Sequence, residues 1–187
     1  YKLFVEKSHQ ILKKDGLLGL VLPSGIYADL GSGALRKLFY ENYEILELCG
    51  FINKKPIFED VHKQFKFCTI LLRKGKPAKK FLARFNEYDD EILQNFRKTS
   101  FTYDRDLIEM SSPDSLSILE CKDKMDQTIV QKQYKFPRLQ QHEWNLEPSR
   151  EFNMTDDAKL FHTNDVGLPL FQGDMIHMFT DSFSSPT

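Results

Sequence analysis

The stretch LLGLVL at residues 17–22 decides the fold, because it is apolar at both alternating sets of positions. A short run of this kind fits a strand buried between two layers of helices. Two further runs, ILELCGF at residues 45–51 and FCTILL at residues 67–72, have the same character. Helical spacing of apolar residues precedes the first run at residues 1–14 and the second at residues 34–40. The order helix, strand, helix, strand, loop, strand predicts an α/β sheet.

Short polar segments mark where these elements begin and end. Asp15 and Gly16 close the first helix, and glycine suits the left-handed position that often follows a helix C-terminus. Pro23 stops the first strand, because proline cannot donate to a strand ladder. Ser32 precedes the second helix and is placed to cap its N-terminus.

The pattern changes character after Pro77. Residues 79–85 fit one more strand and residues 89–97 a polar helix, but the sequence beyond them has weaker periodicity and more proline breaks. Three strands before that point make a small sheet for a stable α/β domain, so we expect the sheet to be incomplete on its N-terminal side. The chain also opens on Tyr1 within a helical pattern and without a starting methionine, which is typical of a domain taken from a longer protein.

The composition allows a globular domain and excludes several classes of protein. Of the 187 residues, 41% are hydrophobic, which is enough for a sizeable core. The formal net charge is -1, so any DNA-binding surface would have to be a local basic patch. Cys49, Cys68 and Cys121 stand far apart with no CxxC pattern, which argues against disulfides and a structural zinc site. Cysteines of this kind are typical of a reducing cytoplasm, where we expect the protein. No signal peptide and no apolar run of membrane-spanning length occurs, so we expect no membrane partner.

Several stretches of the chain, taken in order, resemble one family of enzymes. They are YKLFVEKSHQILKKDGLLGLVLPS at residues 1–24, LRKL at residues 35–38, IFEDV and FKFCTILL within residues 57–72, and LPLFQGDMIH at residues 168–177. All but the last are similar to the segment that follows the Asn-Pro-Pro-Tyr motif in gamma-class adenine-N6 DNA methyltransferases of restriction–modification systems, especially those of type IIG. The last is similar to the family's PLYEGKMIH boundary, where the target-recognition domain opens.

The resemblance implies a fold class and a domain organisation. The fold class is α/β, with a partial doubly wound, Rossmann-like methyltransferase sheet followed by a mixed α+β extension. Residues 1–75 would be the C-terminal half of the methyltransferase-type domain, with its fifth to seventh strands. Residues 76–167 would be an extension that leads toward DNA recognition. Residues 168–187 would begin the target-recognition region and end in a disordered tail.

The implied activity is transfer of a methyl group from S-adenosylmethionine to adenine N6 in double-stranded DNA. That chemistry needs the sulfonium of the donor held close to the adenine amine, and an acceptor that hydrogen-bonds the amine. The family uses a glycine-containing donor loop and Asn-Pro-Pro-Tyr, and neither occurs in this sequence. We therefore expect the catalytic residues outside this chain, no S-adenosylmethionine bound to it, and an N-terminal methyltransferase half as its partner. Such systems imply a bacterial or archaeal cytoplasm.

Phe58 is the residue that the resemblance assigns to the flipped base. An enzyme that methylates a base within duplex DNA extrudes it from the stack, and an aromatic face that replaces the lost neighbours contributes about 1–3 kcal/mol. Phe58 lies in the loop between the second and third strands, where the family has that aromatic residue. Phe65 is the nearest rival. The structural alternative is that Phe58 packs under its own loop.

Other residues near that loop are expected to border the DNA. Pro23 and Ser24 follow a buried strand, so they lie at the carboxyl edge of the sheet, where α/β ligand sites form. The resemblance places them at the border of the active-site cleft. Basic side chains around the loop are candidates for phosphate contacts, although a solvated charged loop explains them equally well. They are Lys54, Lys55, His62, Lys63 and Lys66.

Two other motifs indicate competing functions. GSG at residues 31–33 precedes a helix as in a phosphate cradle, but no strand leads directly into it. Asp114, Glu120 and Lys122 resemble the PD…ExK pattern of metal-dependent nucleases, but the carboxylates are too close in sequence to lie on two adjacent strands. No histidine pair has i, i+4 spacing, so we expect no metal ligands. The open alternatives are a non-catalytic DNA-binding or subunit-contact module and a metal-dependent nuclease fragment.

Overall fold

The structure is a computed structural model of the chain, and it describes residues 1–137, 149, 152–162, 167, 168, 170, 175, 177 and 180. The chain divides into two compact units, Tyr1–Arg138 and Leu139–Thr187. The first unit contains the sheet and every residue that the sequence assigns to the DNA site.

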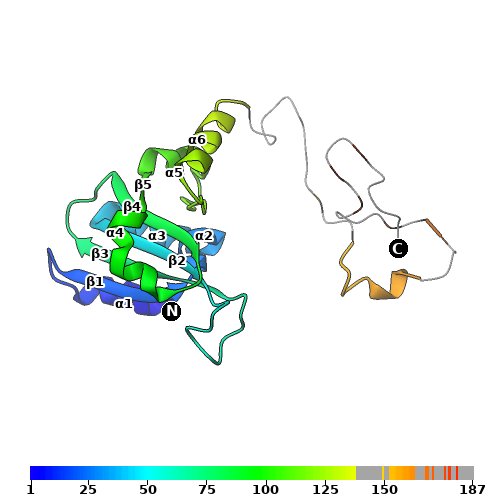
Figure 1. Cartoon of the computed structure of the whole chain (residues 1–187), viewed down its shortest axis with the longest axis horizontal. Coiled ribbons are helices and arrows are strands. Elements are labelled where there is room, and N and C mark those ends of the chain that lie inside the picture. The colour runs from blue at the N-terminus through cyan, green and yellow to red at the C-terminus, as the bar shows by residue number, and fades with distance from the viewer. Residues whose placement is uncertain are drawn as a thin grey trace. The chain divides into compact units, whose positions relative to one another are not determined.

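Five strands form one mixed sheet in the first unit (Figure 1). The apolar runs of the sequence form its first three strands, as predicted. The run at residues 17–22 is not buried between two layers, however, because its strand lies at the edge of the sheet, with Leu17 and Val21 58% and 56% exposed. The order across the sheet is β1-β3-β2-β4-β5. The strands are β1 (Leu17–Pro23), β2 (Tyr43–Ile52), β3 (Lys66–Lys74), β4 (Lys80–Glu87) and β5 (Phe101–Asp104).

The central position of β3 determines the direction of its neighbours. β3 lies between β1 and β2 and runs antiparallel to both. β1 and β2 therefore run in the same direction without pairing with each other, and β4 is parallel to β2. The β2–β3 register runs from Tyr43 opposite Lys74 to Ile52 opposite Lys66. Because β1, β2 and β4 share one direction, their carboxyl ends meet at one end of the sheet.

The sheet continues past residue 75, where the sequence predicts the end of the α/β part. β4 pairs with β2, and β5 pairs antiparallel with β4, so the extension supplies two of the five strands. Phe81, Ala83 and Phe85 alternate along β4 and join the core. This alternation buries one face of β4 and explains why the sheet extends beyond three strands.

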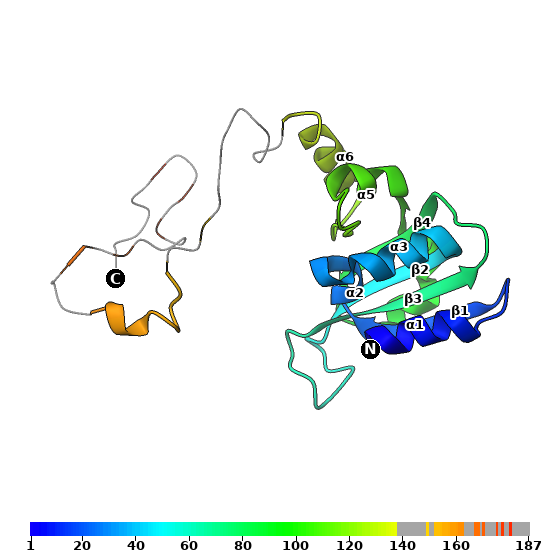
Figure 2. The ribbon, with the colours of Figure 1, turned by 180° about the vertical axis from the view of Figure 1, so that it is seen from behind.

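Helices cover both faces of the sheet. On one face lie α1 (Lys2–Ile11), α2 (Gly25–Ala28) and α3 (Gly33–Asn42) (Figure 2). On the other face lie the 3₁₀ helix η2 (Asp90–Asn95) and α4 (Phe96–Thr99), which together occupy the place of the predicted polar helix (Figure 1).

Strand alternation divides the buried side chains between two cores. The larger core lies under α1–α3 and includes Leu48 of β2, Leu72 of β3 and Ala83 of β4, which are fully buried. The smaller core lies under η2 and α4, on the other face of the sheet. Its buried members are Cys49, Phe51, Phe67 and Phe96.

The turn between α1 and β1 differs in detail from the prediction. The left-handed residue is Asp15, with a φ of 62°, rather than Gly16. A side chain from β3 completes the helix C-terminus, because the Lys74 ammonium donates to the carbonyls of His9 (2.6 Å) and Leu12 (2.8 Å). β3 thereby fixes the end of α1 through a side chain distant in sequence.

The part of the first unit after β5 returns to the beginning of the chain. α5 (Arg105–Ser111) and α6 (Lys124–Gln133) are joined by the irregular segment of residues 112–123. Within it, the Ile118 amide donates to the Tyr27 carbonyl of α2 at 2.9 Å. The segment therefore packs on the face of the sheet that carries α2.

The second unit is described only in part. It contains a 3₁₀ helix, η3 (Ala158–Leu160), and an isolated bridge between His177 and Thr180. Most of residues 168–187, which the sequence assigns to the start of a recognition region, lies outside the described residues. No helix within the described part of the chain has the length and apolar character needed to cross a membrane.

Candidate functional site

The carboxyl ends of β1, β2 and β4 meet where the loop of residues 53–65 joins β2 to β3. Open α/β sheets bind ligands at this end of the strands. Pro23 ends β1 opposite Phe67, and the Ser24 amide donates to the Lys66 carbonyl at 3.1 Å. The two residues predicted to border the cleft therefore lie beside the start of β3 and next to the loop.

Phe58 rests on a buried aromatic stack. Its ring meets Phe67 edge to face, with centroids 5.1 Å apart and planes at 76°. Phe67 in turn stacks on Phe51, with centroids 5.1 Å apart and planes at 11°. Phe51 and Phe67 are buried, while Phe58 is 42% exposed. The ring is thus supported by the smaller core and remains accessible to a flat partner.

One buried side chain holds the backbone of Phe58. Asn53 follows β2 directly and has no exposed surface. Its amide oxygen accepts from the Phe58 amide (3.1 Å), and its amide nitrogen donates to the carbonyls of Phe58 (2.8 Å) and Val61 (2.8 Å). Nothing in the sequence marks Asn53 for this role, because asparagine is common wherever a loop begins.

The first two basic residues of the loop contact the turn after β4. The Lys54 ammonium lies over the ring of Tyr88, 5.4 Å from its centroid. The Lys55 ammonium pairs with the Asp89 carboxylate at 2.8 Å. This hydrogen bond raises the pKa of Lys55 and lowers the pKa of Asp89. Both lysines are exposed, so their charges remain accessible to a larger anion.

The far part of the loop carries His62 and Lys63, and both are exposed. The His62 Nδ1 atom accepts a hydrogen bond from the Gln64 backbone amide at 3.2 Å. The Phe65 amide donates to the His62 carbonyl at 2.9 Å, which closes a tight turn. The two side chains thus extend from a turn whose backbone is held by local hydrogen bonds.

Lys66 belongs to a polar network that reaches the extension. Its ammonium donates to the Glu120 carboxylate and to the Asn86 side-chain oxygen (3.2 Å). The Tyr27 hydroxyl donates to the same carboxylate at 2.7 Å. Burial, together with the hydrogen bond to Glu120, raises the pKa of Tyr27, so this phenol remains a donor. Glu120 therefore balances the charge of Lys66 from a segment that the sequence does not connect with it.

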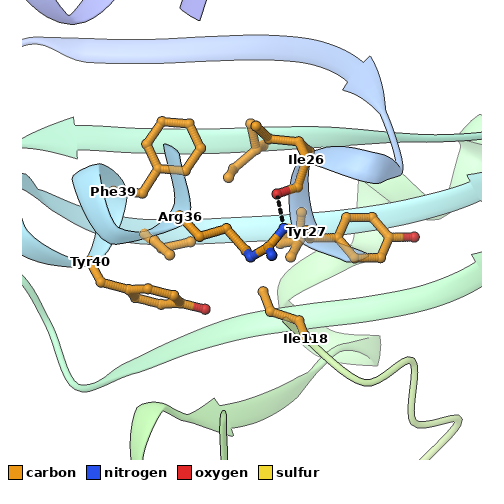
Figure 3. A pocket seen from close by; sticks show the side chains of 9 residues that line it. Ile26, Tyr27, Arg36, Phe39, Tyr40 and Ile118 are labelled. Carbon is orange, nitrogen blue, oxygen red and sulfur yellow. Dashed lines mark hydrogen bonds between the residues drawn. The ribbon is translucent and has the colours of Figure 1, made fainter. Parts of the chain in front are cut away.

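Arg36 ties the same segment to α2 and α3, and it is 2% exposed. Figure 3 shows its guanidinium between Ile26, Tyr27 and Ile118, beside a cavity of about 10 Å³. Such a volume holds about one water molecule, so this is a packed junction rather than a substrate pocket. Burial lowers the pKa of Arg36, although a guanidinium remains protonated. Its acceptors are the carbonyls of Ser115 (2.8 Å), Ile26 (3.0 Å) and Asp29 (2.7 Å) and the Ser117 hydroxyl (3.1 Å).

The two competing motifs lack the geometry that their functions require. Ser32 of the GSG motif is buried, with its hydroxyl 3.4 Å from that of Tyr1, and it precedes α3 without a side-chain capping bond. Asp114 and Glu120 lie in the irregular segment between α5 and α6 rather than on adjacent strands. In the described part of the chain, no three His, Cys, Asp or Glu side chains gather as metal ligands. The three cysteines are buried and unpaired.

Comparisons with known proteins place this chain among enzymes of one class. Residues 1–58 match the Eco57I restriction-modification methylase family. The chain is 32% identical over 143 residues to the type II restriction enzyme and methyltransferase RM.Eco57I of Escherichia coli. That match covers 71% of this chain and 14% of the enzyme, so the chain spans a small part of its relative. The chain is thus related to the methyltransferases of restriction–modification systems, as the sequence predicts. Within this class, both the family model and the curated relative that match this chain carry the name Eco57I.

Three solved structures align with parts of this chain. A modification subunit of a putative type I restriction enzyme from Vibrio vulnificus YJ016 aligns over 57% of this chain and 28% of its own, with 12% identity and a TM-score of 0.48. A chain from a type I restriction–modification system aligns over 71% of this chain and 36% of its own, with 13% identity and a TM-score of 0.48. The type IIG restriction endonuclease BpuSI aligns over 44% and 10%, with 20% identity and a TM-score of 0.36.

Proposed function

We propose that this chain is part of a site-specific DNA adenine-N6 methyltransferase of a restriction–modification system, acting in a bacterial or archaeal cytoplasm. In this proposal, the sheet is the C-terminal half of a doubly wound, Rossmann-like methyltransferase domain. The family match and the helices on both faces of the sheet support this proposal. The observation that carries it is the half-exposed ring of Phe58, supported from below at the carboxyl end of the parallel strands.

The assigned role of Phe58 is to stack on the extruded adenine. A flipped base needs an aromatic face, and a face that is already rigid loses little entropy when the base arrives. Phe65 is similarly exposed, at 43%, but it makes no ring-to-ring contact among the described residues. The geometry therefore favours Phe58 over its rival. Pro23 and Ser24 would form the neighbouring border of the cleft.

The basic residues of the loop would contact phosphates on either side of the extruded base. Lys63 and His62 extend from the exposed turn, and Lys54 and Lys55 lie at the other end of the loop. Lys66 differs, because Glu120 and Asn86 already bind its ammonium. Lys66 is also the least exposed residue of this set. It would contact a phosphate while its ammonium remains bonded to Glu120 and Asn86.

The methyl donor S-adenosylmethionine would bind to a part of the complete protein outside this chain. The cavity beside Arg36, about 10 Å³, is far too small for it. An open hollow of about 250 Å³ beside α6, lined by Leu119 and Ile129, is also below the roughly 300–1,000 Å³ of ligand pockets. Neither of these two hollows is large enough for the donor, and we assign its chemistry to no residue of this chain.

We assign the donor-binding half of the methyltransferase to the edge of the sheet that β1 forms. β1 is paired only with β3 among the described strands, so its outer edge offers unpaired backbone groups. Leu17 and Val21 of β1 are 58% and 56% exposed. Leu3, Phe4 and Ile11 of α1, which lies along β1 in both views, are exposed as well (Figures 1 and 2). An apolar surface of this kind needs a partner. The same surface also supports the alternative that this chain is a non-catalytic subunit-contact module.

Methylation by the full-length protein that carries this chain distinguishes these functions. The substrates are unmethylated phage DNA and S-adenosylmethionine with a tritiated methyl group. Loss of a base-stacking contact of about 1–3 kcal/mol predicts that Phe58→Ala lowers kcat/KM by about 5- to 150-fold. Phe58→Trp preserves an aromatic face and should retain most activity, and Phe65→Ala serves as the exposed control. A Phe58→Ala enzyme within twofold of the original would refute the stacking role.

A further inference from the structure

Asn53 holds the loop of residues 53–65 both at its base and at its middle. The last β2–β3 pair is Ile52 opposite Lys66, and the Asn53 amide donates to the Phe65 carbonyl at 3.0 Å. The Asn53 backbone thus extends the ladder by one bond at the base of the loop. Its side chain reaches the middle of the loop, where it bonds to Phe58 and Val61.

The side chain of Asn53 uses both of its functional groups. An amide supplies one acceptor oxygen and two N–H donors, and here one bond goes to the oxygen and two come from the nitrogen. Both polar backbone groups of Phe58 are included, so this residue is bound as if by a neighbouring strand. Because Asn53 is fully buried, each of these bonds is shielded from water.

We infer that Asn53 is the positioning residue that holds the Phe58 ring at the height where an extruded base stacks. This rests on the proposed function of Phe58. Asn53 itself lies beneath the loop, so it acts through the Phe58 backbone and does not contact the base. The Phe67–Phe51 stack supports the ring, and Asn53 fixes the segment of chain that carries it. A short misplacement of a positioned group costs up to about 100-fold in rate.

Two substitutions separate these contributions. Asn53→Ala removes all three hydrogen bonds, and Asn53→Asp keeps the size and the acceptor but places carboxylate oxygen near two carbonyls. Asn42→Ala is the matched control, because the Asn42 amide makes a single bond to the Leu38 carbonyl (3.0 Å) at the end of α3. Each variant is made in the 187-residue chain for hydrogen exchange and in the full-length protein for methylation.

The three hydrogen bonds from the Asn53 side chain to Phe58 and Val61 form a clamp on the loop. Hydrogen exchange tests this clamp without reference to activity. In the unmodified chain, the Phe58 amide should exchange on the order of 100-fold more slowly than the amides of Glu59 and Asp60. Asn53→Ala and Asn53→Asp should each speed exchange at Phe58 by at least about tenfold, with the amides of β2 and β3 unchanged. Equal exchange at Phe58 in all variants refutes the clamp. If Asn53→Ala fails to fold, Asn53→Asp decides the matter alone.

Methylation kinetics test whether the clamp serves the stacked base. Asn53→Asp should lower kcat by about 10- to 100-fold with the KM for unmethylated phage DNA within threefold, and Asn42→Ala should change neither. In a Phe58→Ala background, a second change at Asn53 should add less than about twofold, because the ring to be positioned is gone. A full additional loss would mean that Asn53 is merely structural. If Phe58→Ala alone has no effect, the stacking function fails, whereas the exchange result still tests the clamp.

Discussion

The buried guanidinium of Arg36 provides the sharpest test of how the extension is attached to the sheet. Arg36→Met keeps the apolar stem of the side chain and removes its four hydrogen bonds, so three carbonyls and the Ser117 hydroxyl each lose one bonding partner. Hydrogen bonds to charged groups contribute about 1.5–3 kcal/mol each. The substitution also removes the cost of desolvating a buried charge, which is several kcal/mol. The net loss in the free energy of unfolding should therefore be about 3–5 kcal/mol.

Urea unfolding of the 187-residue chain, followed by circular dichroism, measures this loss. Arg73→Met is the matched control, since Arg73 is a β3 residue whose half-exposed guanidinium pairs with Glu44 at 2.9 Å. An exposed pair of this kind contributes less than about 1 kcal/mol. A loss of about 3 kcal/mol is a large share of the roughly 5–15 kcal/mol that stabilises a typical domain. If Arg36→Met and Arg73→Met lower stability equally, Arg36 does not tie the segment of residues 112–123 to the sheet.

Three further measurements address other features of the first unit. A double-mutant cycle between Lys66 and Glu120 should give a coupling energy of about 1 kcal/mol in urea unfolding, because their side chains are partly exposed; a value near zero would mean that the pair is incidental. Burial raises the pKa of Cys49 and of Cys68 to about 12, so both should be neutral thiols at pH 8 and react with a thiol reagent only after unfolding, as absorbance of the released product would report. Burial, with help from a nearby lysine, lowers the pKa of His9 below its usual 6.5, so protonation is easier in the unfolded chain. Stability should accordingly fall as the pH drops through 6.5 and then through the lower folded pKa, and His9→Gln should flatten that decline in urea unfolding; an unchanged slope would exclude His9 as its source.

The sequence predicts the first three strands because each is a continuous apolar run of strand length. It does not predict how they pair. β3 comes last along the chain but lies between the other two, and no periodicity encodes that placement. The fourth strand is identified from residues 79–85, but its pairing with β2 requires the structure. The predicted boundary at residue 75 reflects composition, whereas the hydrogen-bonded sheet extends across it.

In the candidate site, too, the sequence identifies residues through their local pattern but not through contacts with distant parts of the chain. Phe58 is identified through its loop and its family resemblance, and the structure adds the stack beneath it. Glu120 and Asn53 are not predicted as partners of the site. Glu120 meets Lys66 only because the segment after α5 returns to the sheet. Asn53 is adjacent to the loop, but its burial depends on how the loop folds over it.

The placement of β3 also has a consequence for the order in which the chain folds. Leu17 pairs with Arg73 and Pro23 with Phe67, so the contacts of β1 within the sheet join residues that are distant in sequence. Proteins dominated by such contacts fold slowly, because loop closure precedes any gain from pairing. A nascent chain that has emerged only as far as Ile52, where β2 ends, holds β1 and β2 but not the strand that lies between them. During synthesis, those two apolar strands therefore have to wait for β3, and this interval is when the chain is most open to aggregation or to capture by a chaperone.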